Sequence, residues 1–282
     1  MSLKSYLPVF IRERLRGWLF RIWKFSLISA AHEQHLYELA KKLIKIVPNI
    51  DDQYSTFQVV SGFWDEKVRF EQAFQISLVN RVIEEFDAPF IVDIGDSSGT
   101  HIQYLQRLHG DRKQMRCLSV NLDPAAVQRI KQKGIDAIHA RAEELDKYNI
   151  AADIFMSFET LEHVMNPAQL LHELSSKTKA RYLIITVPYV AQSRVGLHHI
   201  RHGRRDGIGA ETTHIFELSP EDWRLLAMHS GWKVSYAQIY LQYPKRNLMR
   251  LTKPLWKKFD FEGFYGMILM RDDSWSSLYK DW

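Results

Sequence analysis

The stretch that decides the fold is Phe90-Ile-Val-Asp-Ile-Gly95-Asp-Ser-Ser-Gly99-Thr100. The apolar run from Phe90 to Ile94 predicts a strand that is buried on both faces. Gly95 and Gly99 follow directly, and glycine permits positive φ angles and a close approach of the backbone to a ligand. A helix is predicted from Gly99 to Leu108. A strand that turns through glycines into a helix is typical of an α/β sheet whose crevice lies at the carboxyl ends of the strands.

The same alternation of apolar runs and helical stretches continues toward the C-terminus. Pro124 and the run Ser219-Pro-Glu-Asp222 mark helix starts, because serine caps a helix and proline suits its first position. Gly231 marks a helix end. Further strands are predicted at 117–121, 135–139, 154–157, 182–187, near 232–240 and near 263–270, with a helix at 167–176. We therefore expect a Rossmann-like, doubly wound, mostly parallel seven-stranded sheet with a helical N-terminal extension.

Composition narrows the class of protein. The 282 residues are 46% hydrophobic and 25% charged, which excludes collagen-like, coiled-coil and largely disordered chains. Cys117 is the single cysteine, so neither an intrachain disulfide nor a multi-cysteine zinc site can form. The longest apolar-looking run, Tyr182 to Ala191, is too short to span a membrane. We expect a cytoplasmic protein, with peripheral attachment to a membrane as a second possibility.

Positive charge gathers near the N-terminus. Residues 1–50 hold nine basic and three acidic residues, a net charge of +6, which leaves −1 for the rest of the chain. Residues 8–47 read as helical, and within 8–28 one apolar stripe lies among the basic residues: Ile11, Leu15, Trp18, Leu19, Ile22 and Phe25. Such a helix suits an anionic membrane surface, and it also suits packing on the chain's own domain. We divide the chain into a basic helical extension, 1–85, and a ligand-binding domain, 86–282.

Four segments, in order along the chain, resemble class I S-adenosylmethionine-dependent methyltransferases. Asp93, Gly95 and Gly99 match the acidic-x-Gly-x-Gly-x-Gly motif, with Ser97 at its middle glycine. Residues 141–145, 152–164 and 182–188 resemble the later motifs, and Asn121 stands where the family has an acid that binds ribose. The resemblance implies S-adenosylmethionine as cofactor and these residues as its binding site: Asp93, Gly95, Asp96, Ser97, Gly99, Asn121, Leu122, Ala142, Glu143 and Phe158.

A group of carboxylates and histidines follows the fourth predicted strand. Glu159, Glu162 and His163 are spaced i, i+3 and i+4, so a helix there would place all three on one face. His214 precedes the helix at Ser219. Two carboxylates and two imidazoles suit a divalent cation, and the pattern resembles ubiquinone O-methyltransferases and small-RNA 2′-O-methyltransferases. We predict a metal site of these four residues, with His163 and Glu162 catalytic. The alternative is that the pair only fixes its loop.

Two basic inserts are predicted near 190–212 and 243–260, both at the crevice side of the sheet. Their arginines suit phosphate groups, and they also suit a solvated loop. Together these features favour O-methylation of a hydroxyl on a small, sugar or lipid-linked acceptor. The alternatives are an RNA 2′-O-methyltransferase, disfavoured by the lack of interleaved aromatic residues, and a catalytically silent binding module. We expect His101 and His109 to be solvated surface residues.

Overall fold

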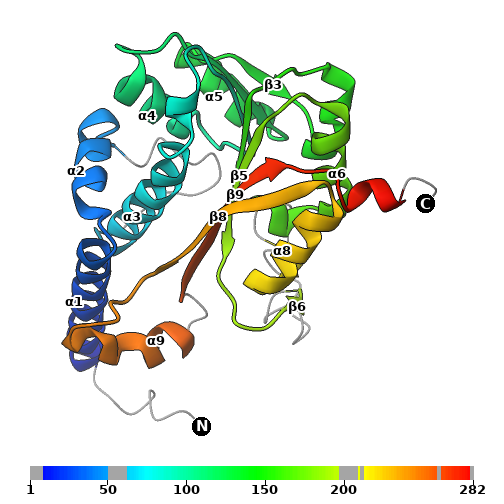
Figure 1. Cartoon of the computed structure of the whole chain (residues 1–282). Coiled ribbons are helices and arrows are strands. Elements are labelled where there is room, and N and C mark those ends of the chain that lie inside the picture. The colour runs from blue at the N-terminus through cyan, green and yellow to red at the C-terminus, as the bar shows by residue number, and fades with distance from the viewer. Residues whose placement is uncertain (1–8, 50–61, 197–208, 210–212, 259–261, 280–282) are drawn as a thin grey trace.

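The computed structural model describes residues 9–49, 62–196, 209, 213–258 and 262–279, and its centre is a seven-stranded sheet (Figure 1). The strand order is β3-β2-β1-β4-β5-β9-β8. Neighbouring strands from β3 to β5 run parallel, whereas β9 runs antiparallel to both of its neighbours. The strands are β1 (Phe90–Ile94), β2 (Arg116–Asn121), β3 (Ala137–His139), β4 (Ile154–Phe158), β5 (Tyr182–Pro188), β8 (Trp232–Leu241) and β9 (Gly263–Arg271). The expected fold class is confirmed.

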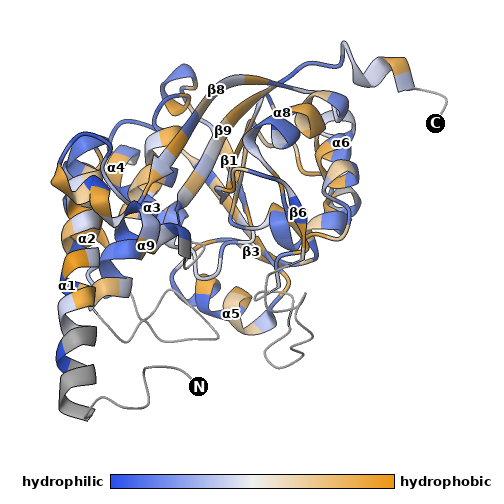
Figure 2. Ribbon diagram, turned by 90° about the horizontal axis from the view of Figure 1, so that it is seen from below, coloured by the Kyte–Doolittle hydropathy of each residue, from blue (hydrophilic) through white to orange (hydrophobic). Residues whose placement is uncertain are grey.

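Helices cover both faces of the sheet, as a mainly parallel sheet requires. They are α4 (Thr100–His109), α5 (Pro124–Gln132), α6 (Pro167–Lys177) and α8 (Pro220–His229). Asp123, Asn166 and Ser219 each cap one of them by accepting a backbone N–H. A proline at the first helical position follows every one of these caps, so the helix starts at Pro124 and Pro220 are confirmed. In Figure 2 the central strands are largely apolar.

One edge of the sheet collects the carboxyl ends of β1, β4 and β5. The antiparallel register sets Pro188 of β5 opposite Phe264 of β9, and Leu241 of β8 opposite Gly263. The second insert, which joins β8 to β9, therefore leaves and re-enters the sheet at this edge. Its described part contains the 3₁₀ helix η6 (Leu248–Thr252) and α9 (Lys253–Lys258). Most of the first insert, 197–208 and 210–212, lies outside the described residues. The described residues on either side of it form two short strands, β6 (Arg194–Val195) and β7 (Phe216–Glu217).

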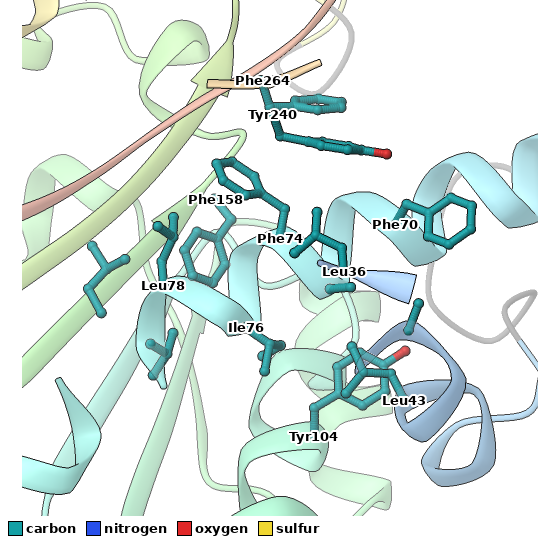
Figure 3. Packing of buried hydrophobic residues seen from close by; sticks show 14 of the residues in the cluster. Leu36, Leu43, Phe70, Phe74, Ile76, Leu78, Tyr104, Phe158, Tyr240 and Phe264 are labelled. Carbon is teal, nitrogen blue, oxygen red and sulfur yellow. The ribbon is translucent and has the colours of Figure 1, made fainter. Parts of the chain in front are cut away.

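Three helices precede the sheet: α1 (Val9–Glu33), α2 (Tyr37–Ile46) and α3 (Gly62–Val79). A turn with His35 at a φ of +61° separates α1 from α2, so the helical stretch expected over 8–47 is interrupted. Helix α3 belongs to the same hydrophobic core as the strands. Figure 3 shows Phe74 and Leu78 of α3 beside Phe158 of β4 and near the rings of Tyr240 and Phe264. One face of the sheet is thus covered in part by a helix from outside the ligand-binding domain that the sequence predicts.

Helix α1 has two apolar faces. One face is buried against the chain, with Leu27, Ala30 and Ala31 fully buried and Phe20 and Trp23 packed beside them. The stripe expected from the sequence lies on another face, where Trp18 is 61% and Phe25 62% exposed. Helix α1 therefore does pack on the chain's own core, but through residues that do not belong to the predicted stripe. No helix in the described part of the chain is long and apolar enough to cross a bilayer.

Gly266 in β9 gives a direct test of how closely α3 must approach the sheet. A Cβ at this position would lie 2.5 Å from Leu78 Cδ1 and 2.7 Å from Phe74 Cζ. We expect Gly266→Ala to lower the free energy of unfolding by about 1 to 3 kcal/mol, because the core has no room for the methyl group. Chemical denaturation measures the change.

Gly17 in α1 is the matched control, because nothing lies within 4 Å of its Cβ position. Gly17→Ala should raise the stability by about 0.5 to 1 kcal/mol through helix propensity alone. Equal effects of the two substitutions would contradict the close packing of α3 on β9.

Candidate functional site

The glycine turn after β1 is held against the loop after β4. Gly95 has a φ of +89°, and a Cβ there would lie 2.2 Å from Thr160 Oγ1. Thr160 in turn bonds to backbone, since its hydroxyl donates to the carbonyl of Phe158 (3.0 Å). Gly99, at a φ of +76°, lets the start of α4 pack on Ile135. Gly95 is therefore needed for the contact between two loops of the chain, as well as for an exposed backbone at the crevice.

Two buried carboxylates lie in this turn. Asp96 Oδ1 accepts hydrogen bonds from the amides of Ser98 (3.2 Å) and Gly99 (2.8 Å). Among the described residues, Asp96 Oδ2 and Asp93 Oδ1 have no hydrogen-bond partner. Burial, together with the charge of Asp93, raises the pKa of Asp96 to about 6. Two buried oxygens without a donor indicate a place for a cationic group.

His101 connects this turn to α3. Its Nδ1 lies 3.0 Å from Asp93 Oδ2, and its Nε2 lies 3.0 Å from Gln75 Oε1. Gln75 uses its amide nitrogen to donate to Thr186, so its oxygen faces the histidine. Burial opposes a charged imidazole, but the charge and hydrogen bond of Asp93 outweigh it and raise the pKa of His101. Both ring nitrogens of His101 therefore face an oxygen acceptor, one on Asp93 and the other on Gln75.

The expectation that His101 and His109 are solvated is wrong. His101 is largely buried, and His109 is buried with its Nε2 2.8 Å from the side-chain oxygen of Asn80. Their positions on α4 explain this, because one turns toward α3 and the other toward the segment that follows it. The sequence around a single histidine does not indicate a contact with a residue so far away along the chain.

Asn121 ties the end of β2 to the glycine turn. Its amide nitrogen donates to the carbonyl of Asp96 (2.8 Å), and its oxygen accepts from the amide of Asp123 (2.7 Å). A carboxylate could not make the first of these bonds. The structure thus gives Asn121 a loop-bracing contact. The remaining cofactor candidates line the same edge: Leu122 is exposed, Ser97, Ala142 and Glu143 are half-buried, and Phe158 is buried against His101.

The segment after β4 is not the α-helix that the spacing suggested. Glu159 has a left-handed φ of +49°, and only Leu161–His163 form a 3₁₀ turn, η5. Glu159 is therefore separated from Glu162 and His163. Within the described chain, two groups have ligand atoms that all lie within 4.8 Å of one another: Glu162, His163 and His214 form one, and Asp93, Asp96 and His101 form the other. Three of the four predicted metal ligands come together, and Glu159 does not join them.

Glu162 is the most constrained of these residues. Its side chain is only 1% exposed, and neither of its oxygens has a hydrogen-bond partner among the described residues. Burial raises the pKa of Glu162 to about 7, although the nearby His214 opposes the shift. A carboxylate in this state is costly without a cation or a donor.

The two histidines are oriented by neighbours on their far sides. His163 Nδ1 donates to the carbonyl of Thr213 (3.0 Å), which leaves Nε2 3.9 Å from Glu162 Oε1. Burial and the charge of His214 lower the pKa of His163 to about 4, so its Nε2 carries a lone pair. His214 Nδ1 donates to Glu217 Oε1 (2.7 Å). Burial disfavours a charged His214, but the hydrogen bond to Glu217 and the charge of Glu162 raise its pKa.

Glu217 and Arg194 complete the support for this cluster. Glu217 is buried, and its second oxygen is paired with Arg194 across the short β6–β7 ribbon. Outer hydrogen bonds of this type fix the tautomer of metal-binding histidines. The sequence reasoning missed Glu217, although its position three residues after His214 was a usable signal. Arg194 belongs to the first basic insert, for which the sequence leaves phosphate binding and a solvated loop open.

Helix α3 contributes a charged pair to the same edge. Lys67 and Glu71 form an ion pair of 3.2 Å in which both side chains are largely buried, and Lys67 lies over the ring of Phe264. Burial, Glu162 and Glu71 raise the pKa of Glu159 well above its usual range. The crevice edge therefore combines several carboxylates with few cations. The sequence assigned α3 to an extension, so this contribution was not foreseen.

Comparisons with known proteins agree with this fold. Residues 92–182 match the family described as a methyltransferase domain. No curated protein matches the chain by sequence. Many solved structures resemble it. One comes from the complex between a methyltransferase activator of Haloferax volcanii and a putative methyltransferase (TM-score 0.53, 13% identity, covering 74% of this chain and 92% of that one).

Two further structures show the same resemblance. A putative sarcosine dimethylglycine methyltransferase from Galdieria sulphuraria has a TM-score of 0.51 and 15% identity, covering 75% of this chain and 88% of its own. The 1,6-didemethyltoxoflavin-N1-methyltransferase of Burkholderia thailandensis, solved with S-adenosylhomocysteine, has a TM-score of 0.51 and 11% identity, covering 91% and 90%. At these identities the structures establish the fold. The match of residues 92–182 to a methyltransferase domain, together with this fold, supports the activity of an S-adenosylmethionine-dependent methyltransferase.

Proposed function

We propose that the chain transfers the methyl group of S-adenosylmethionine to a hydroxyl oxygen of its acceptor, at a divalent cation held by Glu162, His163 and His214. One observation carries the proposal. The carboxylate of Glu162 is buried without a hydrogen-bond partner beside two imidazoles whose Nδ1 atoms are already engaged, and one ligand atom of each residue lies within 4.8 Å of the others. This donor set suits Mn²⁺, Fe²⁺ or Zn²⁺ better than Mg²⁺, which prefers oxygen ligands.

The residues at the end of β1 fit the cofactor. S-adenosylmethionine carries a positive ammonium group, and the free oxygens of Asp93 and Asp96 are acceptors for such a cation. The exposed backbone of Gly95 and the half-buried Ser97 lie beside them. Gly99, Asn121, Leu122, Ala142, Glu143 and Phe158 complete the site that we propose for the cofactor. When bound, the cofactor supplies an electrophilic methyl group.

The chain's own residues orient the acceptor and remove its proton. A bound divalent cation would lower the pKa of an acceptor hydroxyl and fix its position. Thr213 and Glu217 accept from the Nδ1 atoms of the two imidazoles, which leaves each Nε2 available as a ligand. Glu162 has a pKa near 7, so its carboxylate can also take the hydroxyl proton directly, whereas His163, with a pKa of about 4, is a weak base and serves as a ligand. Methyl transfer then depends mainly on positioning.

The acceptor that we propose is a hydroxyl compound that is small, sugar-containing or lipid-linked. The lipid-linked class is favoured by exposed apolar residues on the insert between β8 and β9, namely Leu248 and Leu251, because this insert starts and ends at the crevice edge. The aliphatic character of these side chains does not favour RNA, whose bases stack on aromatic surfaces.

The pKa of Asp96 predicts how cofactor binding depends on pH. Because its folded value of about 6 exceeds the usual 3.8, the folded chain binds this proton more tightly than the unfolded chain. Asp96 therefore lowers stability as pH rises from about 4 to 6, and a cation that prefers the ionised carboxylate binds more tightly over the same range. We expect the affinity for S-adenosylmethionine, measured by calorimetry, to rise through about pH 6.

Asp96→Asn should remove this rise and weaken binding above pH 6 by about tenfold to a hundredfold, as expected for the loss of a charge-assisted hydrogen bond. Asp111→Asn, at an exposed position beyond α4, is the matched control and should leave affinity and pH profile unchanged. An unchanged profile in Asp96→Asn would contradict the assignment of Asp96. No binding to the wild type at millimolar concentration would refute cofactor binding altogether.

Metal binding is tested by titrating Mn²⁺ or Zn²⁺ into the purified protein. The wild type should bind one ion, and Glu162→Gln, His163→Ala and His214→Ala should each weaken binding by more than tenfold. Glu217→Ala should weaken it by about tenfold to a hundredfold, because Glu217 only orients His214. His172→Ala, exposed on α6, should have no effect. Activity that survives exhaustive chelation, or variants that bind as the wild type does, would exclude the metal.

A further inference from the structure

We propose that α1 and the segment from Lys245 to Lys253 together form a docking surface for a membrane that contains anionic lipid. We call this the α1–η6 surface. Its apolar members are Trp18, Leu19, Phe25, Leu248 and Leu251, and its basic members are Arg14, Arg21, Lys245, Arg246, Arg250 and Lys253. The inference goes beyond methyl transfer, because membrane binding is measured without any acceptor.

The apolar members are exposed to a degree that folding does not require. Trp18 and Phe25 stand on the face of α1 away from the core, as described above. On η6, Leu248 is 84% and Leu251 73% exposed. Large apolar side chains that gather on one surface mark an interaction site more often than single scattered ones do.

Hydrogen bonds fix the second insert along α1. The hydroxyls of Ser26 and Thr252 lie 2.8 Å apart, and Trp256 Nε1 donates to Ser26 Oγ (3.1 Å). About two turns further along α1, Glu33 accepts from the backbone amides of Lys245 (2.9 Å) and Arg246 (3.0 Å). The segment thus runs beside α1 in the opposite direction, and the two elements present one rigid surface.

The exposed stripe of α1 borders this segment. On a helix, Ser26 and Glu33 lie within about 100° of Trp18 and Phe25. The side of α1 that contacts η6 is therefore adjacent to the side that exposes the two aromatic rings. In Figure 1, α1 lies at one side of the molecule with α9 at its lower end, while the C-terminal segment lies at the opposite side.

The charge of the surface selects the partner. The six basic members are exposed, and among the acidic residues described beside them Glu33 is engaged by backbone amides and Glu66 is paired with Lys24. Apolar and aromatic side chains flanked by basic ones are typical of interfacial helices on anionic bilayers. A symmetric contact with a second copy would bring like charges together. Nucleic acid would leave Leu248 and Leu251 without apolar partners.

The location of the surface suits a lipid-linked acceptor. The insert leaves β8 at Leu241 and returns at Gly263, at the same edge as the carboxyl ends of β1, β4 and β5. Docking through η6 would therefore bring this edge near the bilayer. Only this consequence rests on the proposed function, and the binding itself does not.

Flotation with lipid vesicles tests the proposal on the full chain. The protein should bind vesicles of phosphatidylcholine with phosphatidylglycerol. Binding should weaken strongly between 50 and 500 mM salt, because this increase shortens the Debye length about threefold. Vesicles of pure phosphatidylcholine should bind much less. Equal binding to both, or none to either, would overturn the proposal.

Two double variants separate the contributions. Leu248→Ser with Leu251→Ser should lower binding more than tenfold, since burying each leucine contributes to insertion. Arg250→Glu with Lys253→Glu should lower binding at least 25-fold, because each basic residue contributes about fivefold near an anionic surface. The matched controls are Leu278→Ser, 70% exposed on η7 (Ser276–Tyr279), and Lys233→Glu on β8. Cofactor affinity and denaturation midpoints confirm that each variant is folded.

Three outcomes would contradict the α1–η6 surface as a membrane site. The first is vesicle binding that the controls weaken as much as the double variants do. The second is a dimer in light scattering that the leucine variant dissociates while vesicle binding is absent. The third is retention of RNA that depends on Arg250 and Lys253 in the absence of vesicle binding. Loss of cofactor affinity in the wild type would instead concern only the methyltransferase site.

Discussion

The constraint on which the site depends is the burial of carboxylates at one edge of the sheet. Asp93, Asp96, Glu159 and Glu162 all have an oxygen without a partner in the described structure, and burial is the largest cause of the raised pKa of the last three. Removing carboxylates from water is unfavourable unless cations or donors replace the lost hydration. The fold therefore leaves an unmet need for cations or donors where β1, β4 and β5 end. A positively charged cofactor on one side and a divalent cation on the other would both relieve it.

A rigid set of contacts maintains this arrangement. Gln75, His101 and Asp93 form a hydrogen-bonded chain from α3 to β1. The contact of Thr160 with Gly95 brings the loop after β4 against the loop after β1, and Asn121 braces the latter from β2. The carboxylates consequently cannot turn toward solvent without breaking packing elsewhere. This rigidity is what a site based on positioning requires.

The sequence predicts the sheet well, because strand runs, glycine turns and helix caps are local signals that agree with one another. Phe90–Ile94 and the helix starts at Pro124 and Pro220 show this. It predicts the site in part. Glu162, His163 and His214 lie together, but the left-handed φ of Glu159 was not readable from spacing. Contacts between distant segments, such as those of His101 with Gln75 or of α1 with η6, leave no local pattern. They could not have been found without the structure.

The most direct test of the metal-assisted site is a crystal structure of the protein grown with S-adenosylhomocysteine and Mn²⁺, with anomalous data collected for manganese. We expect one anomalous peak about 2.0 to 2.3 Å from His163 Nε2, His214 Nε2 and a Glu162 oxygen. We also expect S-adenosylhomocysteine with its ammonium group at Asp93 and Asp96. A map without a peak at Glu162 when the cofactor product is fully bound would contradict the account.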